Sequence, residues 1–143
     1  EKMLAKLLDK ILPVTEVSCH CDIPCGIYDP HDALQAAQTV IRMTELIEGL
    51  DYSEGPSSSL GNSMARFVNA KEEHAKKAKD DILVIWTDYF KPEHLEKYPD
   101  LHEKVWNACK LGSYVKVNVD LDKAKEFKAA LEEIGEIFWE TKK

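Results

Sequence analysis

Residues 63–89 read SMARFVNAKEEHAKKAKDDILVIWTDY, and their apolar side chains recur at the three- and four-residue spacing of an α-helix. Charged residues fill most other positions, so one face of this long helix is apolar and the opposite face is charged. The apolar face consists of Met64, Phe67, Val68, Ala75, Ala78, Ile82, Ile85, Trp86 and Tyr89. Such a face must be buried against other elements, which predicts a helical bundle.

Three more segments, one before this helix in the sequence and two after it, also have apolar residues at helical spacing. The first begins at Asp29 and Pro30, an N-cap followed by proline at the first helical position, and runs to about residue 50. The others span 101–111 and 120–138. These segments predict an all-α protein, an up-and-down four-helix bundle.

Two stretches between these helices carry other signals. Residues 52–62, which contain two glycines, a proline and several serines, predict a flexible loop. The alternating valines within 114–119 hint at a short strand, although one short strand cannot stand alone. The last helix is expected to start after Asp120, which is a good N-cap residue.

Composition narrows the class of partner. The chain has 143 residues, which is one domain's worth, with a net charge of −7 and a pI near 5.2. This acidity argues against nucleic acid or an anionic membrane as the main partner, and no segment reaches transmembrane length. A small anionic substrate would need local attraction, for which Lys91 and Arg66 are candidates. Taken singly, each reads better as an ordinary surface cation.

Residues 1–19 form a separate unit. Their apolar positions recur at helical spacing with charges between them, which predicts an amphipathic helix ended by Pro13. A secretory signal needs an uninterrupted apolar stretch, which this segment lacks. We therefore expect a cytoplasmic protein in which 1–19 is a leader to be removed, or a helix that binds a partner, and 20–143 is the domain.

Residues 20–30 read HCDIPCGIYDP and concentrate metal-binding chemistry in a segment that we call the hook, residues 20–28. Cys21 and Cys25 can reach one ion if the chain between them curls, and Pro24 favours a curl. If His20 were the first residue, its amine and imidazole could bind the same metal as both thiolates and the backbone nitrogen of Cys21. Thiolates with an amine and a deprotonated amide suit nickel or copper rather than zinc. The alternative is a small disulfide or two inert thiols.

The four cysteines do not read as a disulfide framework. Cys19, Cys21 and Cys25 lie within seven residues, which favours local metal or redox chemistry over a link between distant parts of the fold. Cys109 lies in an apolar helical stretch and is most simply a buried small hydrophobe.

The segment HCDIPCGIYDP resembles the amino-terminal hook of the nickel superoxide dismutase family, which reads His-Cys-Asp-x-Pro-Cys-Gly-x-Tyr-Asp-Pro. Three later blocks are also similar to that family: WTDYFKP at 86–92, YPDLH at 98–102 and IFWETKK at 137–143. A CxxxC pair alone would be a weak signal. An eleven-residue hook followed in order by three matching blocks is specific, and together they extend to the last residue.

The resemblance implies an enzyme that disproportionates superoxide to dioxygen and hydrogen peroxide through a Ni(II)/Ni(III) cycle. The implied nickel ligands are His20, in the axial position, Cys21 and Cys25. A homohexamer is implied as well. Because His20 is internal in this sequence, a processing protease would have to cut before it to turn its amide nitrogen into an amine ligand.

The resemblance also implies neighbours for the ligands. Tyr28 would lie beside the metal with Tyr89 as its hydrogen-bond partner, although core packing explains Tyr28 equally well from the sequence alone. Asp22 would accept hydrogen bonds near the ligands, where Pro24 shapes the turn; the ordinary reading of Asp22 is a solvated carboxylate.

Two family positions differ in this chain. The family commonly has a glutamate in the first helix and an arginine in the second that together steady the axial imidazole, and Ala36 and His74 align with them. Gln35 or Gln38, or a contact from another subunit, could take over that support.

A second function, from a class other than enzymes, also fits the sequence. In this case the chain is a helical module that binds a thiophilic metal, or senses redox state through its thiols, without turnover. An uncut amino terminus would favour this alternative, because it removes the amine ligand.

Overall fold

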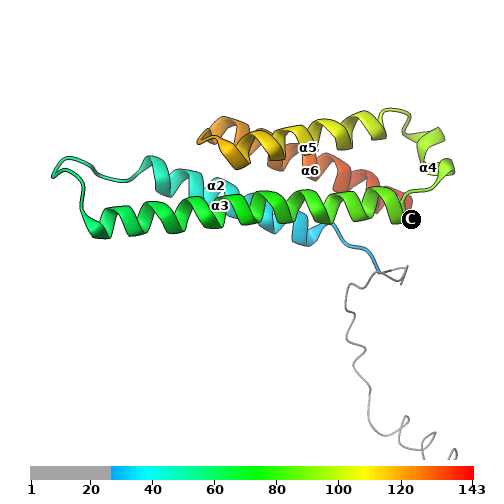
Figure 1. Cartoon of the computed structure of the whole chain (residues 1–143). Helices are drawn as coiled ribbons and strands as arrows, with labels where there is room; N and C mark the ends of the chain where they lie inside the picture. Colours follow the sequence, from blue (N-terminus) through cyan, green and yellow to red (C-terminus); the bar gives the residue numbers. More distant parts are fainter. Residues whose placement is uncertain (1–26) are drawn as a thin grey trace, which may run out of the picture.

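The computed structural model describes residues 27–143, which form an all-α bundle (Figure 1). Its four long helices are α2 (His31–Glu48), α3 (Ser58–Val84), α5 (Leu101–Val117) and α6 (Leu121–Thr141). A π-helical turn, η1 (Ile85–Tyr89), continues α3, and the short helix α4 (Pro92–Lys97) lies in the connection to α5. The leader helix and hook expected from the sequence fall mostly on residues 1–26, outside the described part.

The long helices form an up-and-down bundle, as predicted. Each helix packs against two others: α2 against α3 and α6, and α5 against α3 and α6. Cross-helix hydrogen bonds show that α3 and α5 are antiparallel, because Lys71 pairs with Val115 whereas Trp86 pairs with His102. The described helices include none long and apolar enough to cross a membrane.

The core lies along the bundle axis and is built from the predicted apolar faces. The largest fully buried apolar side chains are Phe127, Phe138, Ile82, Ile85, Leu101, Leu131 and Ile134. At Gly112 the helices approach so closely that a Cβ atom would lie 2.9 Å from the ring of Phe127 and 2.7 Å from Cγ of Lys79. This glycine allows α5 to pack tightly against α3 and α6.

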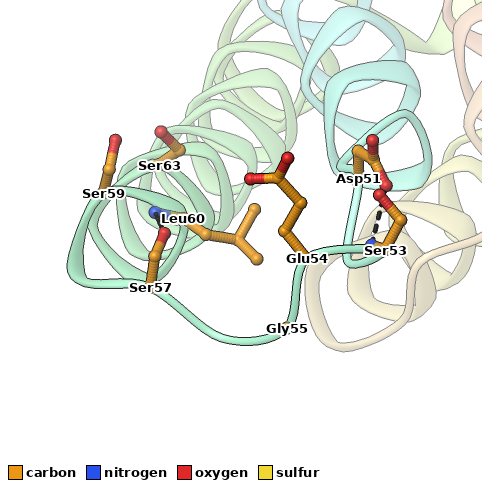
Figure 2. Close-up of a pocket in the computed structure, with 8 residues that line it drawn as sticks. All are labelled: Asp51, Ser53, Glu54, Gly55, Ser57, Ser59, Leu60 and Ser63. Carbon is orange, nitrogen blue, oxygen red and sulfur yellow. Dashed lines mark hydrogen bonds between the residues drawn. The ribbon is translucent and has the colours of Figure 1, made fainter.

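The connection between α2 and α3 is shorter than the sequence suggests, because α3 begins at Ser58 rather than near Ser63. Ser57 is the N-cap, and its hydroxyl accepts a hydrogen bond of 3.1 Å from the Leu60 amide (Figure 2). The prediction of a loop to residue 62 is therefore wrong at its end. Serine favours both loops and N-caps, and here it starts the helix.

The expected strand is also wrong, since α5 continues to Val117 and no strand occurs between residues 27 and 143. Val115 is buried whereas Val117 is exposed. The ammonium group of Lys71 reaches the end of α5 and donates hydrogen bonds to the carbonyls of Val115 (2.6 Å), Lys116 (2.8 Å) and Asn118 (3.0 Å). It satisfies carbonyls that the end of a helix leaves without partners.

Both predicted helix starts at Asp29 and Asp120 have local support. The Asp29 carboxylate accepts a hydrogen bond of 2.8 Å from the His31 amide, although Pro30 occupies the N-cap position itself. Asp120 is the N-cap of α6, and its carboxylate accepts from the Lys123 amide at 3.0 Å. Thus α2 starts three residues after Tyr28, the last residue of the hook.

Candidate metal centre at the end of the bundle

The predicted ligands His20, Cys21 and Cys25, with Asp22 and Pro24, precede the described residues. The structure places the other predicted site residues, Tyr28, Tyr89, Arg66 and His74. Tyr28 is buried, with 7% of its surface exposed, where α2 begins. The site is therefore described from the bundle surface around Tyr28.

Tyr28 and Tyr89 lie together, as the sequence analysis expects, with ring centroids 5.7 Å apart and ring planes tilted by 59°. The Tyr89 hydroxyl is hydrogen-bonded to the Thr141 hydroxyl at 2.9 Å. The pairing of the two tyrosines is thus seen as a ring contact, and a hydrogen bond between their hydroxyls stays a prediction.

Tyr89 is placed by the π-helical turn η1. The Phe90 amide donates to the Ile85 carbonyl at 3.2 Å, a bond that spans five residues instead of four. Such turns insert one extra residue into a helix and are frequent at functional sites. Nothing in the sequence pattern predicts this turn, which rotates Tyr89 relative to the face of α3 that precedes it.

Aromatic rings surround Tyr89. Its centroid lies 4.5 Å from that of Phe138 on α6 and 5.3 Å from that of Phe90. The imidazole of His94, on α4, stacks on Tyr89 with centroids 5.6 Å apart and ring planes at 23°. Packing from α4 and α6, together with the adjacent Phe90, therefore limits how far the Tyr89 ring can turn.

The blocks that carry the family resemblance meet at this end of the bundle. Trp86 donates its indole N–H to Nδ1 of His102 at 2.9 Å, which joins the first later block to the second. Tyr98 donates to Glu140, which joins the second to the third. Lys142, in the third, donates to the Tyr28 carbonyl at 3.1 Å and so reaches the hook.

Ala36 and His74, the two positions that differ from the family, share a shallow cavity of about 160 Å³ between α2 and α3. Its other lining residues are Asp32, Gln35, Thr39 and Lys77. Nδ1 of His74 is 2.8 Å from the Ala70 carbonyl one turn earlier. Gln35 lies at the cavity and Gln38 does not, so Gln35 is the better placed of the two proposed substitutes.

Charge at this cavity is balanced across the helices. Lys77 of α3 forms ion pairs with Asp32 of α2, at 3.5 Å, and with Asp81. Burial by itself lowers the pKa of Lys77, but the hydrogen bond to Asp81 and the charges of both aspartates raise it above its ordinary value. The cation stays protonated and helps to hold α2 against α3.

The two cations proposed to attract an anion lie in different places. Lys91 is exposed and follows Phe90 directly, next to the aromatic cluster. Arg66 is exposed on α3, 19 residues before η1 begins at Ile85, which corresponds to about 28 Å along the helix. Within one chain the structure brings Lys91 to the tyrosine end and leaves Arg66 distant from it.

Other features lie apart from this end. A cavity of about 320 Å³ is lined by the loop after α2 and the start of α3, including Asp51, Glu54 and Ser57 (Figure 2), at the opposite end of the bundle. Cys109 is half-buried on α5, and burial raises its pKa although the charge of Lys79 lowers it. The sequence predicts a buried small hydrophobe at this position, whereas the structure leaves Cys109 only half-buried.

Sequence reasoning missed His94, Thr141 and Lys142 as neighbours of the tyrosines. Thr141 and Lys142 belong to the IFWETKK block, so the resemblance offered a signal. For His94 there was none, because its contact with Tyr89 depends on the direction that α4 takes after Pro92.

Fold and site together define a class: an all-α bundle with a cluster of aromatic side chains around Tyr28 and Tyr89 at one end, preceded in sequence by a cysteine-rich segment. A family model described as nickel-containing superoxide dismutase matches residues 15–142. The chain belongs to this family.

Known relatives agree. The chain is 38% identical over 141 residues to proteins named superoxide dismutase (Ni) from Streptomyces coelicolor and Streptomyces seoulensis, and 99% of this chain and of each relative is covered. A solved structure of native nickel superoxide dismutase is similar with a TM-score of 0.76 and 39% identity, covering 87% of this chain and 100% of that chain.

Proposed function

We propose that this protein is a nickel superoxide dismutase whose metal centre is formed by His20, Cys21 and Cys25 of the hook. The reaction converts two superoxide ions and two protons to dioxygen and hydrogen peroxide. The observation that carries the proposal is a series of hydrogen bonds that links the three later family blocks to one another and ends at the carbonyl of Tyr28, the last residue of the hook.

The donor set fits nickel. Among residues 27–143 no three His, Cys, Asp or Glu side chains are grouped so that they could hold a metal ion, and the sequence places two thiols and an imidazole in the hook. Two thiolates, an amine, an amide nitrogen and an imidazole are donors that nickel accepts. Bound there, nickel supplies one-electron oxidation and reduction of superoxide.

The chain's own residues have separate roles in this proposal. Tyr28, buried and packed on Tyr89, presents its phenol beside the hook, where it limits access and can pass a proton to the peroxide product. Lys91 adds positive charge at this end of an otherwise acidic protein. Asp22 accepts hydrogen bonds near the ligands, and Pro24 shapes the turn that brings the two thiols together.

Removal of residues 1–19 by a processing protease is part of the proposal. Residues 20–143 number 124 of 143, which is 87% of the chain, and the solved relative is fully covered by that same share. Cleavage before His20 exposes an amine with a pKa of about 7.7–8.0, from which a metal can displace the proton near neutral pH.

We also propose a cytoplasmic homohexamer. The most exposed large apolar side chains of the described residues include Trp106 (61%) and Val117 (74%) on α5. These provide apolar area that association would remove from water. Light scattering of the processed protein that shows only monomer would contradict the assembly.

The test of the metal centre is replacement of each thiol. Cys21→Ser and Cys25→Ser should abolish superoxide removal and the rhombic Ni(III) signal in electron paramagnetic resonance, while helix content stays unchanged because the hook precedes the core. Stoichiometric zinc or copper in protein from its native host, with no activity on adding nickel, would favour the non-catalytic module instead.

The leader is tested by comparing chains that begin at Glu1 and at His20. After nickel loading, the shorter chain should remove superoxide and the longer one should not. Equal activity, with Glu1 confirmed intact by mass, would remove the proposed reason for cleavage.

A further inference from the structure

The last turn of α6 contacts the backbone at which the hook joins the bundle. Nζ of Lys142 donates a hydrogen bond of 3.1 Å to the carbonyl oxygen of Tyr28, across a separation of 114 residues in sequence. Figure 1 shows the C-terminus at the end of the bundle where α3 ends. The two ends of the described chain are therefore joined directly by one side chain.

Aromatic rings hold the Lys142 ammonium in place. Nζ lies 4.6 Å from the ring centroid of Phe138, 5.5 Å from that of Trp139 and 5.8 Å from that of Tyr89. Each distance is within the range in which a cation is attracted to the face of a ring. A long lysine side chain is mobile when free in water, so these contacts restrict the direction from which it reaches Tyr28.

Thr141, the residue before Lys142, contacts the second tyrosine, Tyr89. Oγ1 of Thr141 is hydrogen-bonded to the Tyr89 hydroxyl at 2.9 Å and donates to the Phe138 carbonyl at 2.7 Å. Tyr89 in turn packs against Tyr28. Consecutive residues of one helix end thus hold the Tyr28 backbone and the ring on which Tyr28 rests.

We propose that Thr141 and Lys142 are positioning residues that fix where the hook leaves the bundle and how the Tyr28 phenol is oriented. This rests on the proposed metal centre in the hook. Cys25 is three residues before Tyr28, and three residues span at most about 11 Å, so the position of Tyr28 limits where the second thiolate can lie. The hydrogen bond and the cation–π contacts both act at this junction.

The first test needs no nickel. Hydrogen exchange of the backbone amides in 27–31 is measured in the full chain with Lys142→Met, and with Lys143→Met as the matched control, because Lys143 is the exposed next residue. Lys142→Met removes the charge and the donor but keeps most of the apolar stem. Exchange should become about three- to tenfold faster, the loss expected for one hydrogen bond of ordinary net strength, because Lys142 is exposed to solvent. Lys142→Arg, which keeps charge and donors, should restore most of the protection.

The second test uses the nickel-loaded chain that begins at His20. Lys142→Met should broaden the Ni(III) resonance, because the hook then samples more positions, while circular dichroism stays unchanged; Lys143→Met should match the unmodified protein. If exchange in Lys142→Met equals that of the control, the proposal is wrong. Faster exchange with an unchanged resonance would also overturn it, since the contact would then be only structural.

Failure of the metal proposal is separable from failure of this one. If the unmodified chain gives no Ni(III) signal, the proposed ligands are wrong, and the positioning role toward them is overturned with them, whereas the exchange result still reports on the contact between Lys142 and Tyr28.

Discussion

Replacement of Lys71 by methionine is expected to destabilise the bundle more than any other single lysine substitution in the described part of the chain. The Lys71 side chain is 2% exposed, and its ammonium donates to three carbonyls at the end of α5, at 2.6, 2.8 and 3.0 Å. Methionine has a similar length and can fill the space, but it cannot donate. The perturbation therefore removes hydrogen bonds without opening a large cavity.

The change in the free energy of unfolding caused by Lys71→Met is the difference between two opposing contributions. Hydrogen bonds from a charged donor contribute about 1.5–3 kcal/mol each, which for three bonds is a large loss. Burying an ammonium group costs several kcal/mol, and methionine does not incur this cost. Water can also reach the freed carbonyls if the last turn of α5 frays. We therefore expect the free energy of unfolding to fall by about 2–4 kcal/mol, a substantial part of the 5–15 kcal/mol that is typical of a domain.

Urea unfolding of the nickel-free protein, followed by circular dichroism, measures this change. Lys76→Met is the matched control, because Lys76 is also on α3 but exposed, and its ion pair with Asp80 should contribute less than about 1 kcal/mol. Amides of residues 115–119 should lose protection in Lys71→Met alone. Equal stability of the two variants would refute the reasoning that Lys71 terminates α5.

The pH dependence has a defined sign. Burial lowers the pKa of Lys71 below its ordinary 10.5, and the charge of Glu72 only partly opposes this. Between the lowered pKa and 10.5 the unfolded chain binds more protons at this residue than the folded chain, so this contribution to stability rises with pH. The stability of the unmodified protein relative to Lys71→Met should therefore increase as the pH approaches 10.5. A decrease would contradict the burial of a charged lysine.

Further predictions concern packing and reactivity. Gly112→Ala should lower the free energy of unfolding by about 1–3 kcal/mol, because its Cβ would overlap Phe127. Gly61→Ala, in open space on α3, should raise the free energy of unfolding by up to about 1 kcal/mol. Denaturant titration measures both changes, and changes of the same sign would contradict the close approach of the helices at Gly112. Cys109 should react with iodoacetamide more slowly in the folded than in the unfolded chain at pH 8, because burial raises its pKa and limits access of the reagent. Mass spectrometry of the peptide that contains Cys109 measures both rates. Equal rates would show that this thiol is open to solvent.

Much of the fold could be predicted from periodicity. Residues 120–138 repeat apolar side chains at helical spacing after an aspartate cap, and α6 begins at Leu121 with Asp120 as its N-cap. This agreement has a local cause, since a cap and an amphipathic face are made by residues within a few turns of each other. The same holds for α2, with Asp29 at its start.

Two boundaries could not be predicted because their causes are not local. Valines at 115, 117 and 119 alternate as in a strand, yet α5 continues to Val117. The ammonium of Lys71, which precedes Val115 by 44 residues, donates hydrogen bonds to the last carbonyls of this helix. The π-helical turn at Ile85–Tyr89 likewise has no distinct pattern in the sequence.

The candidate site divides in the same way. The sequence by itself predicted the donor chemistry, since His20, Cys21 and Cys25 stand close together along the chain. Only the tertiary structure decided what Tyr28 meets, because Tyr89, Thr141 and Lys142 come from segments about 60 and 113 residues away that folding alone brings together. Local order follows from nearby residues, whereas the aromatic surface around Tyr28 exists only once the helices have packed.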